Sequence, residues 1–155
     1  MAIDIGIETK ARKKIVAALE QVLADTYGLY GKTHGYHWNV EGPMFNTLHL
    51  MFETQYNDLW LSLDLIAERI RSLGEYAPFG AEIGAKSQVP GDKGVPNAEE
   101  MLANLVSGNE LLARSARGAL KAAEEAGDQA TADLMTQRVA VAEKTAWMLR
   151  SMAAK

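Results

Sequence analysis

The chain contains no cysteine, which excludes disulfide bonds, zinc–thiolate sites and thiol catalysis. It also lacks an apolar stretch of the roughly 18 residues that a membrane-spanning helix needs. The N-terminal segment MAIDIGIETK lacks the basic region followed by an apolar region that is typical of a secretory signal. We therefore expect a cytoplasmic protein without a membrane partner. The formal net charge of −4 gives no general reason to bind nucleic acid.

What is present is helical periodicity. The 155 residues, 48% of them hydrophobic, are sufficient for one compact domain with a real core. Apolar residues recur at helical spacing in four long stretches, and no stretch shows a strand pattern. A predicted capping box, Asn97 with Glu100, starts the third stretch. After a short tail at 1–7, we expect long helices over about 8–38, 43–74, 97–126 and 128–155.

The connection between the second and third helices, residues 75–96, holds three prolines and four glycines. Within it, Ala81 to Lys86 could form one short helix. A link of this length joins helices whose ends are far apart. The sequence therefore predicts a single all-α domain over 1–155, a four-helix bundle with one long crossover. A stripe of glycines on the first helix, Gly28, Gly31 and Gly35, is expected to let another helix backbone approach closely.

Five potential metal ligands stand between the first helix and the end of the second: His37, His49, Glu53, Asp64 and Glu68. Imidazole and carboxylate groups suit borderline and hard cations. His49 and Glu53 are four residues apart, as are Asp64 and Glu68, so each pair shares one face of a helix. Asp64 lies in the apolar run LWLSLDLIAERI, where we expect a buried carboxylate that needs a partner.

The length of the second helix limits how these groups can meet. His49 and Asp64 are fifteen residues apart, which is about 22 Å along a continuous helix, whereas metal–ligand bonds are roughly 2 Å. Unless the helix breaks, either there are two separate sites or a second, antiparallel copy brings its acids to the first copy's histidines. The competing interpretation is a solvated helix face with packed histidines.

The segments LADTYGLYGKTHGYHWNVEGPMFNTLHLMFETQY, DLIAERIRSLG and TADLMTQRV closely resemble the Dps family, the mini-ferritins named as DNA-binding proteins from starved cells. The likeness covers nearly the whole chain. Its most specific part is the combination of HWNV, a histidine twelve residues later with an acid four beyond it, and a D-x-x-x-E pair fifteen residues after that histidine.

The resemblance implies a ferritin-like bundle assembled into a hollow homododecamer. It implies a ferroxidase centre at each twofold interface, which binds two iron ions and oxidises Fe²⁺ to Fe³⁺ with hydrogen peroxide in preference to dioxygen. Ferric oxyhydroxide would be stored in the cavity, which protects DNA under oxidative stress. Many relatives carry aspartate at the position of Glu53. Carried over residue by residue, one subunit supplies His37, His49 and Glu53, and its mate supplies Asp64 and Glu68.

Other residues have two open interpretations each. Trp38, beside the first ligand, is either an electron donor or a packed aromatic, and packing is the expectation for Trp60 and Trp147. His34 is either an outer group of the metal site or the donor of an interface hydrogen bond. Three acids lie around the turn into the fourth helix: Glu124, Asp128 and Asp133. In the Dps family, acids in this region line threefold pores that admit iron. The alternative is that Asp128 caps the helix and the other two lie on a solvated face.

A competing function is compaction of DNA in the bacterial nucleoid. Relatives that bind DNA often use a lysine-rich tail, but residues 1–7 contain no basic residue. The best candidate for phosphate contacts is the cluster Lys10, Arg12, Lys13 and Lys14. Such a run is more often the solvated face of a helix, and a cage of twelve negative chains repels DNA overall.

Overall fold

The computed structural model describes all residues from Met1 to Lys155 and contains only helices, turns and loops. The four long helices and the short one are confirmed, with ends within two residues of the expected positions at most termini. No helix combines the length and the apolar character required to cross a membrane. The elements are α1 (Thr9–Asn39), α2 (Phe45–Ser72), α3 (Ala81–Lys86), α4 (Ala98–Glu125) and α5 (Gln129–Ala153).

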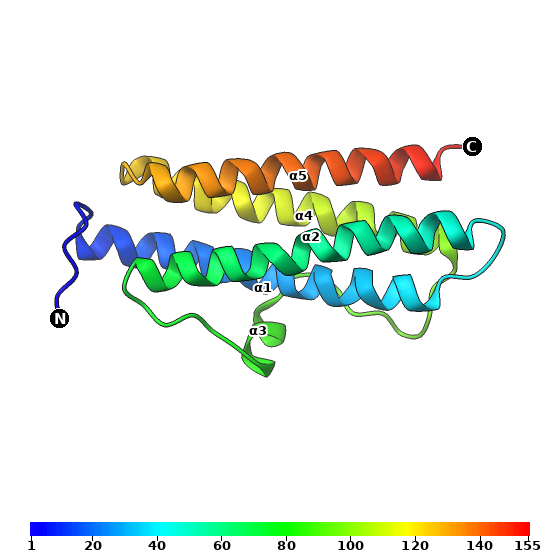
Figure 1. The fold of residues 1–155 in the computed structure, drawn as a ribbon, viewed down its shortest axis with the longest axis horizontal. Helices are drawn as coiled ribbons and strands as arrows, with labels where there is room; N and C mark the ends of the chain where they lie inside the picture. Colours follow the sequence, from blue (N-terminus) through cyan, green and yellow to red (C-terminus); the bar gives the residue numbers. More distant parts are fainter.

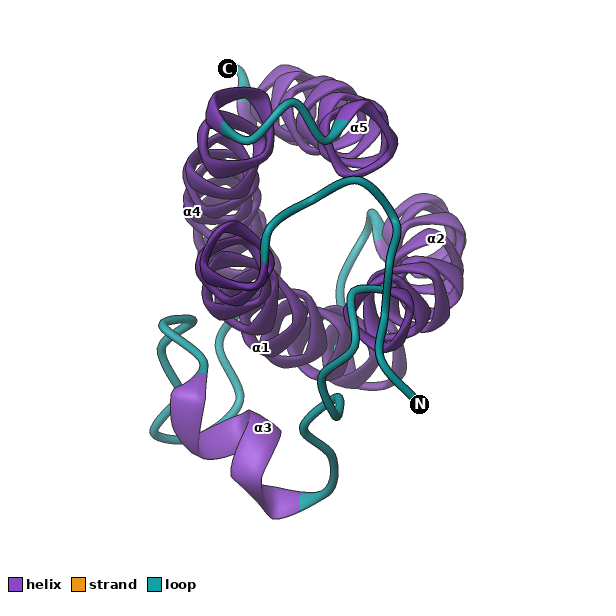
Figure 2. Ribbon diagram, turned by 90° about the vertical axis from the view of Figure 1, so that its left-hand side faces the viewer, coloured by secondary structure: helices purple, strands orange, loops and turns teal.

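The long helices form two antiparallel hairpins, α1 with α2 and α4 with α5, which pack together mainly through α1 and α4. The crossover carries the chain back along the length of the bundle, so that α4 starts at the end where α1 finishes (Figure 1). Seen end-on, α3 lies outside the bundle beside α1 (Figure 2). This arrangement confirms the predicted four-helix bundle with its crossover between α2 and α4.

The core is a continuous apolar cluster with members from every helix. Its largest side chains include Phe52, Ile66 and Leu112, all essentially without exposure. Helices α1 and α4 pack closely at Gly108, where an added Cβ atom would lie 2.6 Å from Leu29 Cδ1. A larger residue at this position would force the buried Leu29 side chain to shift.

The predicted role of the glycine stripe on α1 is wrong within this chain. Gly28 faces the side chains of Ser87 and Val89, which belong to the crossover and not to a helix. Gly31 and Gly35 have no heavy atom from elsewhere in the chain within 4 Å of an added Cβ. Only Gly28 therefore allows a close approach, and the segment that approaches it is the crossover, which runs over α1.

A fully buried carboxylate fastens the crossover to the bundle. Asp25 on α1 has no exposure and accepts hydrogen bonds from the backbone nitrogen of Gln88 at 2.7 Å and from its side-chain amide at 3.2 Å. Ser115 Oγ on α4 also donates to it, and so does Gln21 Nε2 at 3.0 Å. Buried charge is costly unless it is solvated by donors, so these four bonds hold α1, α4 and the crossover in one arrangement.

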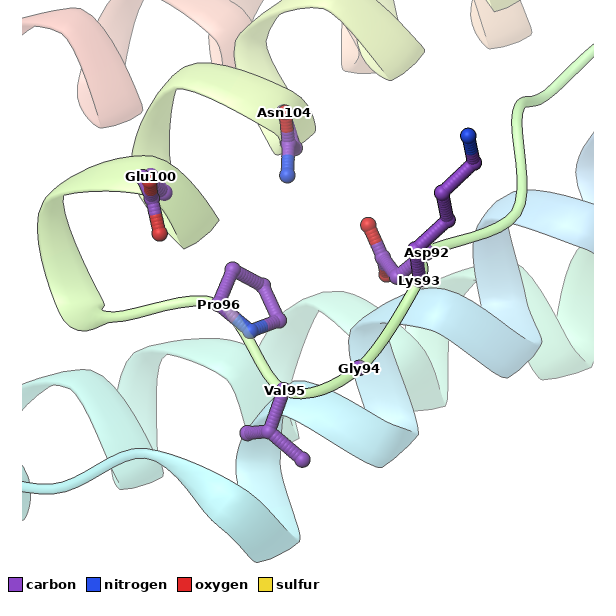
Figure 3. Close-up of a pocket in the computed structure, with 7 residues that line it drawn as sticks. All are labelled: Asp92, Lys93, Gly94, Val95, Pro96, Glu100 and Asn104. Carbon is purple, nitrogen blue, oxygen red and sulfur yellow. The ribbon is translucent and has the colours of Figure 1, made fainter.

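A second fastening lies nearer the start of α4. The buried Tyr36 hydroxyl donates to Asp92 Oδ2 at 2.8 Å and accepts from Asn104 Nδ2 at 3.0 Å. Asp92 also pairs with the Lys32 ammonium at 3.1 Å. Figure 3 shows Asp92 and Asn104 on opposite sides of a polar hollow between the crossover and α4. Burial, reinforced by the Asp92 carboxylate, raises the pKa of Tyr36 well above its ordinary value.

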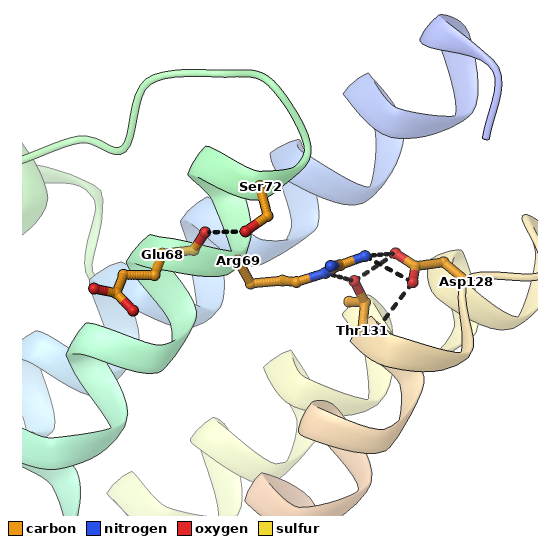
Figure 4. Close-up of polar contacts among 5 residues, drawn as sticks. All are labelled: Glu68, Arg69, Ser72, Asp128 and Thr131. Atoms are coloured by element: carbon orange, nitrogen blue, oxygen red, sulfur yellow. Dashed lines mark hydrogen bonds and ion pairs between the residues drawn. The ribbon is translucent and has the colours of Figure 1, made fainter. Parts of the chain in front are cut away.

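Ion pairs link α2 to α5, where the helices share less apolar contact. Arg138 on α5 binds Asp58 on α2 at 2.7 Å. The guanidinium of Arg69 binds both oxygens of Asp128 at 2.9 and 3.1 Å, and its Nε donates to Thr131 Oγ1 at 2.8 Å (Figure 4). Asp128 also caps α5 by accepting from the Thr131 backbone nitrogen at 3.1 Å, which confirms the predicted cap.

The ionisation of Asp128 is coupled to folding. Burial opposes its charged form, but hydrogen bonds from Thr131 and the charge of Arg69 outweigh that penalty and lower the pKa of the carboxyl. A carboxyl with a lowered folded-state pKa stabilises the fold above its unfolded pKa of about 3.9. That stabilisation is lost as the pH falls through the folded-state pKa.

We expect Asp128→Asn to lower the free energy of unfolding at pH 7 by about 2–4 kcal/mol, because it leaves the partly buried Arg69 without its counter-ion, whereas asparagine caps a helix about as well as aspartate does. The difference from wild type should shrink below about pH 4, where the wild-type carboxyl protonates. Denaturant titration at several pH values measures both effects. Asp133→Asn, on the exposed face of α5, is the matched control and should change little; an equal loss in the control would contradict the assignment.

Candidate metal centre

The structure brings His37 and His49 together. His37 lies in the last turn of α1 and is 8% exposed, and His49 lies in the first turns of α2. Their rings stack with centroids 3.8 Å apart and planes 13° apart. The turn through residues 40–44 reverses the chain tightly enough to place the end of α1 beside the start of α2 (Figure 1).

Reciprocal hydrogen bonds fix both imidazoles. His37 Nδ1 contacts the carbonyl oxygen of His49 at 2.7 Å, and His49 Nδ1 contacts the carbonyl oxygen of His37 at 2.7 Å. A carbonyl oxygen only accepts, so each Nδ1 carries the proton and donates. In the neutral ring the lone pair is then on Nε2, which is the form that binds a metal ion. The two backbone carbonyls therefore prepare two nitrogen ligands side by side.

The acids are distributed along α2 at different distances from this pair. Glu53 follows His49 by one turn and is half-buried. The helix continues without a break from Phe45 to Ser72, so Asp64 stays about 22 Å from His49 along the axis. Within one chain, no three side chains of the ligand types form a cluster that could hold an ion. A single copy thus presents two histidines at one end of α2 and two acids at the other.

Asp64, which we expect to need a partner, has none among the hydrogen bonds and ion pairs of the single chain, so its burial against a second copy remains a prediction. Both Asp64 and Glu68 are exposed, because the buried face of α2 is formed by Leu59, Ile66 and Ile70. In Figure 4 the Glu68 carboxylate points away from the Arg69 guanidinium, on the opposite side of α2. The acids share their outward surface with three large apolar side chains that are each more than half exposed: Trp60, Leu61 and Leu65.

Aromatic rings extend the histidine pair along the groove between α1 and α2. Tyr56 meets the His37 ring edge-on at a centroid distance of 5.1 Å, and it stacks on His34 at 3.8 Å with planes 17° apart. Tyr30 Oη lies 3.0 Å from His34 Nδ1. Sequence reasoning missed both tyrosines. Their signal was spacing, because each lies seven residues from a ligand histidine and so on the same helix stripe.

His34 is therefore placed by Tyr30 and Tyr56 within its own chain. Loss of hydration lowers the pKa of His34, and repulsion from a charged His37 acts in the same direction. Trp38 is 66% exposed, with its ring centroid 4.3 Å from that of His34. Trp60 and Trp147, for which packing was the expectation, are 55% and 59% exposed in the single chain, so their packing against a second subunit remains a prediction.

The residues considered for a pore differ in their availability. Glu124 and Asp133 are exposed, and the Asp133 carboxylate accepts from Gln137 Nε2 at 3.1 Å. Asp128 is 3% exposed, and both of its oxygens are engaged by Arg69 and Thr131. Asp128 therefore acts as a cap and an ion-pair partner within the chain, and the lining of a pore remains a prediction.

The basic cluster at the start of α1 is partly engaged. Arg12 donates to the Ile7 carbonyl oxygen at 2.6 Å. Lys14 binds Glu125 Oε2 at 2.7 Å and lowers the pKa of that carboxyl. Lys10 and Lys13 are exposed. Two of the four bases are thus available without breaking a contact in the chain.

Comparisons with known proteins agree with the fold. The family model of the ferritin-like domain matches residues 16–155. The chain is 41% identical to a low temperature-induced protein of Nostoc sp., over 96% of this chain and 85% of that protein. It is 33% identical to the DNA protection during starvation protein of Brevibacillus brevis, over 94% of this chain and 98% of that relative.

A solved structure, that of the Dps protein from Vibrio cholerae O1, superposes with a TM-score of 0.93 at 33% identity and covers 99% of this chain and 98% of its own. It is described as a member of a broad superfamily of ferritin-like diiron-carboxylate proteins. The family match, the identities and the superposition confirm the predicted resemblance. The chain belongs to the Dps family of ferritin-like proteins.

Proposed function

We propose that the protein is an iron-detoxifying and iron-storing mini-ferritin whose ferroxidase centre is shared between two subunits. The observation that carries the proposal is the preparation of two imidazole Nε2 ligands at one end of α2, with the acid pair about 22 Å away on the same straight helix. An antiparallel second copy supplies the missing half, so that each twofold interface holds two equivalent centres.

The surface around the acids supports an interface. Asp64 and Glu68 lie among Trp60, Leu61 and Leu65, whose exposure is unusual for large apolar side chains on the surface of a monomer. Covering them with a second copy removes apolar area from water and brings the carboxylates next to imidazoles. Both effects favour the same pairing. The proposed hollow dodecamer needs a further type of contact to join these twofold dimers, because a twofold interface closes on itself.

The ligand set suits oxidation of Fe²⁺ as substrate. His37 and His49 bind Fe²⁺ through neutral nitrogen, while Glu53, Asp64 and Glu68 supply anionic oxygen. Carboxylates stabilise Fe³⁺ more than Fe²⁺, because the higher charge strengthens the attraction. Two Fe²⁺ ions give two electrons to one hydrogen peroxide, which becomes two hydroxide ions without release of a hydroxyl radical. The Fe³⁺ product is stored as ferric oxyhydroxide, and DNA in the cytoplasm is protected from oxidative damage.

We expect His37→Ala and Glu68→Ala each to slow peroxide-dependent Fe²⁺ oxidation by at least about tenfold. Loss of a group that only supports a metal ligand already lowers metal affinity or activity by about that factor, and loss of the ligand itself should lower it at least as much. Stopped-flow absorbance of the ferric product measures the rate, and light scattering measures particle size on the same sample. Glu110→Gln, on the exposed surface of α4, is the control. Unchanged rates in both ligand variants would remove the assignment.

Mixing variants tests whether the centre is shared. When His37→Ala and Glu68→Ala chains are unfolded together and reassembled in equal amounts, about a quarter of the shared centres recover both intact halves. The matched control mixes His37→Ala with His49→Ala, which damages the same half in every chain and should recover no activity. If the first mixture also stays inactive although its particles reassemble, the ligands are not divided between subunits as proposed.

DNA binding is the alternative function, acting through Lys10, Arg12, Lys13 and Lys14. We expect no mobility shift of duplex DNA at about 150 mM salt, because few phosphate contacts survive salt at this strength and the chain is negative overall. The control is the protein with all four bases changed to glutamine. A shift at that salt concentration which disappears in the control would establish DNA binding through this cluster.

A further inference from the structure

A hydrogen-bonded tyrosine–histidine pair lies two ring contacts from the histidine ligands. Tyr30 Oη is 3.0 Å from His34 Nδ1. Both residues are on α1 and share the stripe of His37, because the intervals of four and three residues return to one helix face. The Tyr36 hydroxyl instead faces the crossover and α4, where it binds Asp92 and Asn104.

Closely spaced rings connect this pair to the ligands. The Tyr56 ring centroid is 6.3 Å from that of Tyr30 and 5.1 Å from that of His37. Tyr56 also stacks on His34 at 3.8 Å. An electron that leaves Tyr30 therefore crosses only ring-to-ring contacts before it reaches an imidazole ligand. Tyr30, His34 and His37 belong to α1 and Tyr56 to α2, so these ring contacts join the two helices, which run side by side in Figure 1.

We propose that Tyr30 and His34 supply one electron to the ferroxidase centre when hydrogen peroxide meets a single Fe²⁺ there. This inference rests on the proposed function. One Fe²⁺ gives peroxide only one electron and yields Fe³⁺, hydroxide and a hydroxyl radical. Tyr30 gives the second electron, its phenolic proton moves to His34 Nδ1, and the hydroxyl radical becomes hydroxide. The sum is Fe³⁺, two hydroxide ions, a neutral tyrosyl radical and a protonated His34.

The hydrogen bond is what selects Tyr30 as the donor. A phenol that loses an electron becomes a strong acid, so its oxidation is favourable only where a base takes the proton at once. His34 Nδ1 occupies that position in the neutral ring whose proton is on Nε2. Trp38 lies closer to solvent, with its ring 4.3 Å from that of His34, and it is the competing donor that an experiment has to separate.

Electron paramagnetic resonance on the assembled protein tests the proposal. The sample is loaded with one Fe²⁺ per centre, mixed with excess hydrogen peroxide and frozen. We expect a tyrosyl radical that narrows when the tyrosines are ring-deuterated. The signal should be lost in Tyr30→Phe and in His34→Gln, and kept in Trp38→Phe. Tyr76→Phe, which removes an 84% exposed tyrosine, is the matched control and should keep the signal.

Spin trapping provides a second readout. Hydroxyl-radical adducts in solution should increase in Tyr30→Phe and His34→Gln relative to the Tyr76→Phe control, because the radical is no longer reduced at the centre. Circular dichroism and particle size show whether each variant is folded, and the two substitutions perturb different residues of the same pair.

The outcomes separate this inference from the proposed function. A tyrosyl signal that persists in folded Tyr30→Phe, or one that disappears only in Trp38→Phe, overturns the role of Tyr30. A wild-type protein that oxidises two Fe²⁺ per centre with peroxide, yet forms no tyrosyl radical at one Fe²⁺, overturns the inference alone. A wild-type protein that oxidises no iron overturns both.

Discussion

The straightness of α2 is the constraint on which the candidate site depends. A continuous helix from Phe45 to Ser72 holds its one histidine, His49, and its acid pair apart by a distance that no side chain can bridge. In the proposed pairing, the same separation places the two half-sites of α2 opposite those of an antiparallel copy. A kink in the middle of α2 would weaken both halves at once, since it would change their separation and their relative direction.

Two backbone carbonyl groups orient the candidate ligand histidines. The bonds from His37 and His49 to each other's carbonyl oxygens join the last turn of α1 to the first turns of α2, and they orient both rings before any ion arrives. Preorganised ligands lose less freedom when they bind. The end of α1 thus serves the fold and the site with the same two hydrogen bonds.

Features with local signals were predictable from the sequence. The capping box at Asn97 and the cap at Asp128 depend on residues three positions apart, and the apolar periodicity marked all four long helices. The exposure of Asp64, the loop against Gly28 and the donors around Asp25 depend on which surfaces the crossover and the other helices cover. An apolar run does not reveal which face of the helix packs on the core of its own chain. The exposure of Asp64 in the single chain could therefore not be predicted from the sequence.

The hydrogen bonds to Asp25 and Tyr36 hold the second part of the crossover more firmly than the first part. Residues near Gln88 and Asp92 are tied to α1 and α4 through Asp25 and Tyr36, whereas Tyr76 and Phe79 are 84% and 83% exposed. A protease cuts a segment of backbone that has opened locally, and the hydrogen bonds of the tied portion resist this opening. Chymotrypsin, which prefers aromatic residues, would therefore nick the folded chain first after these two side chains and leave two helical hairpins still associated.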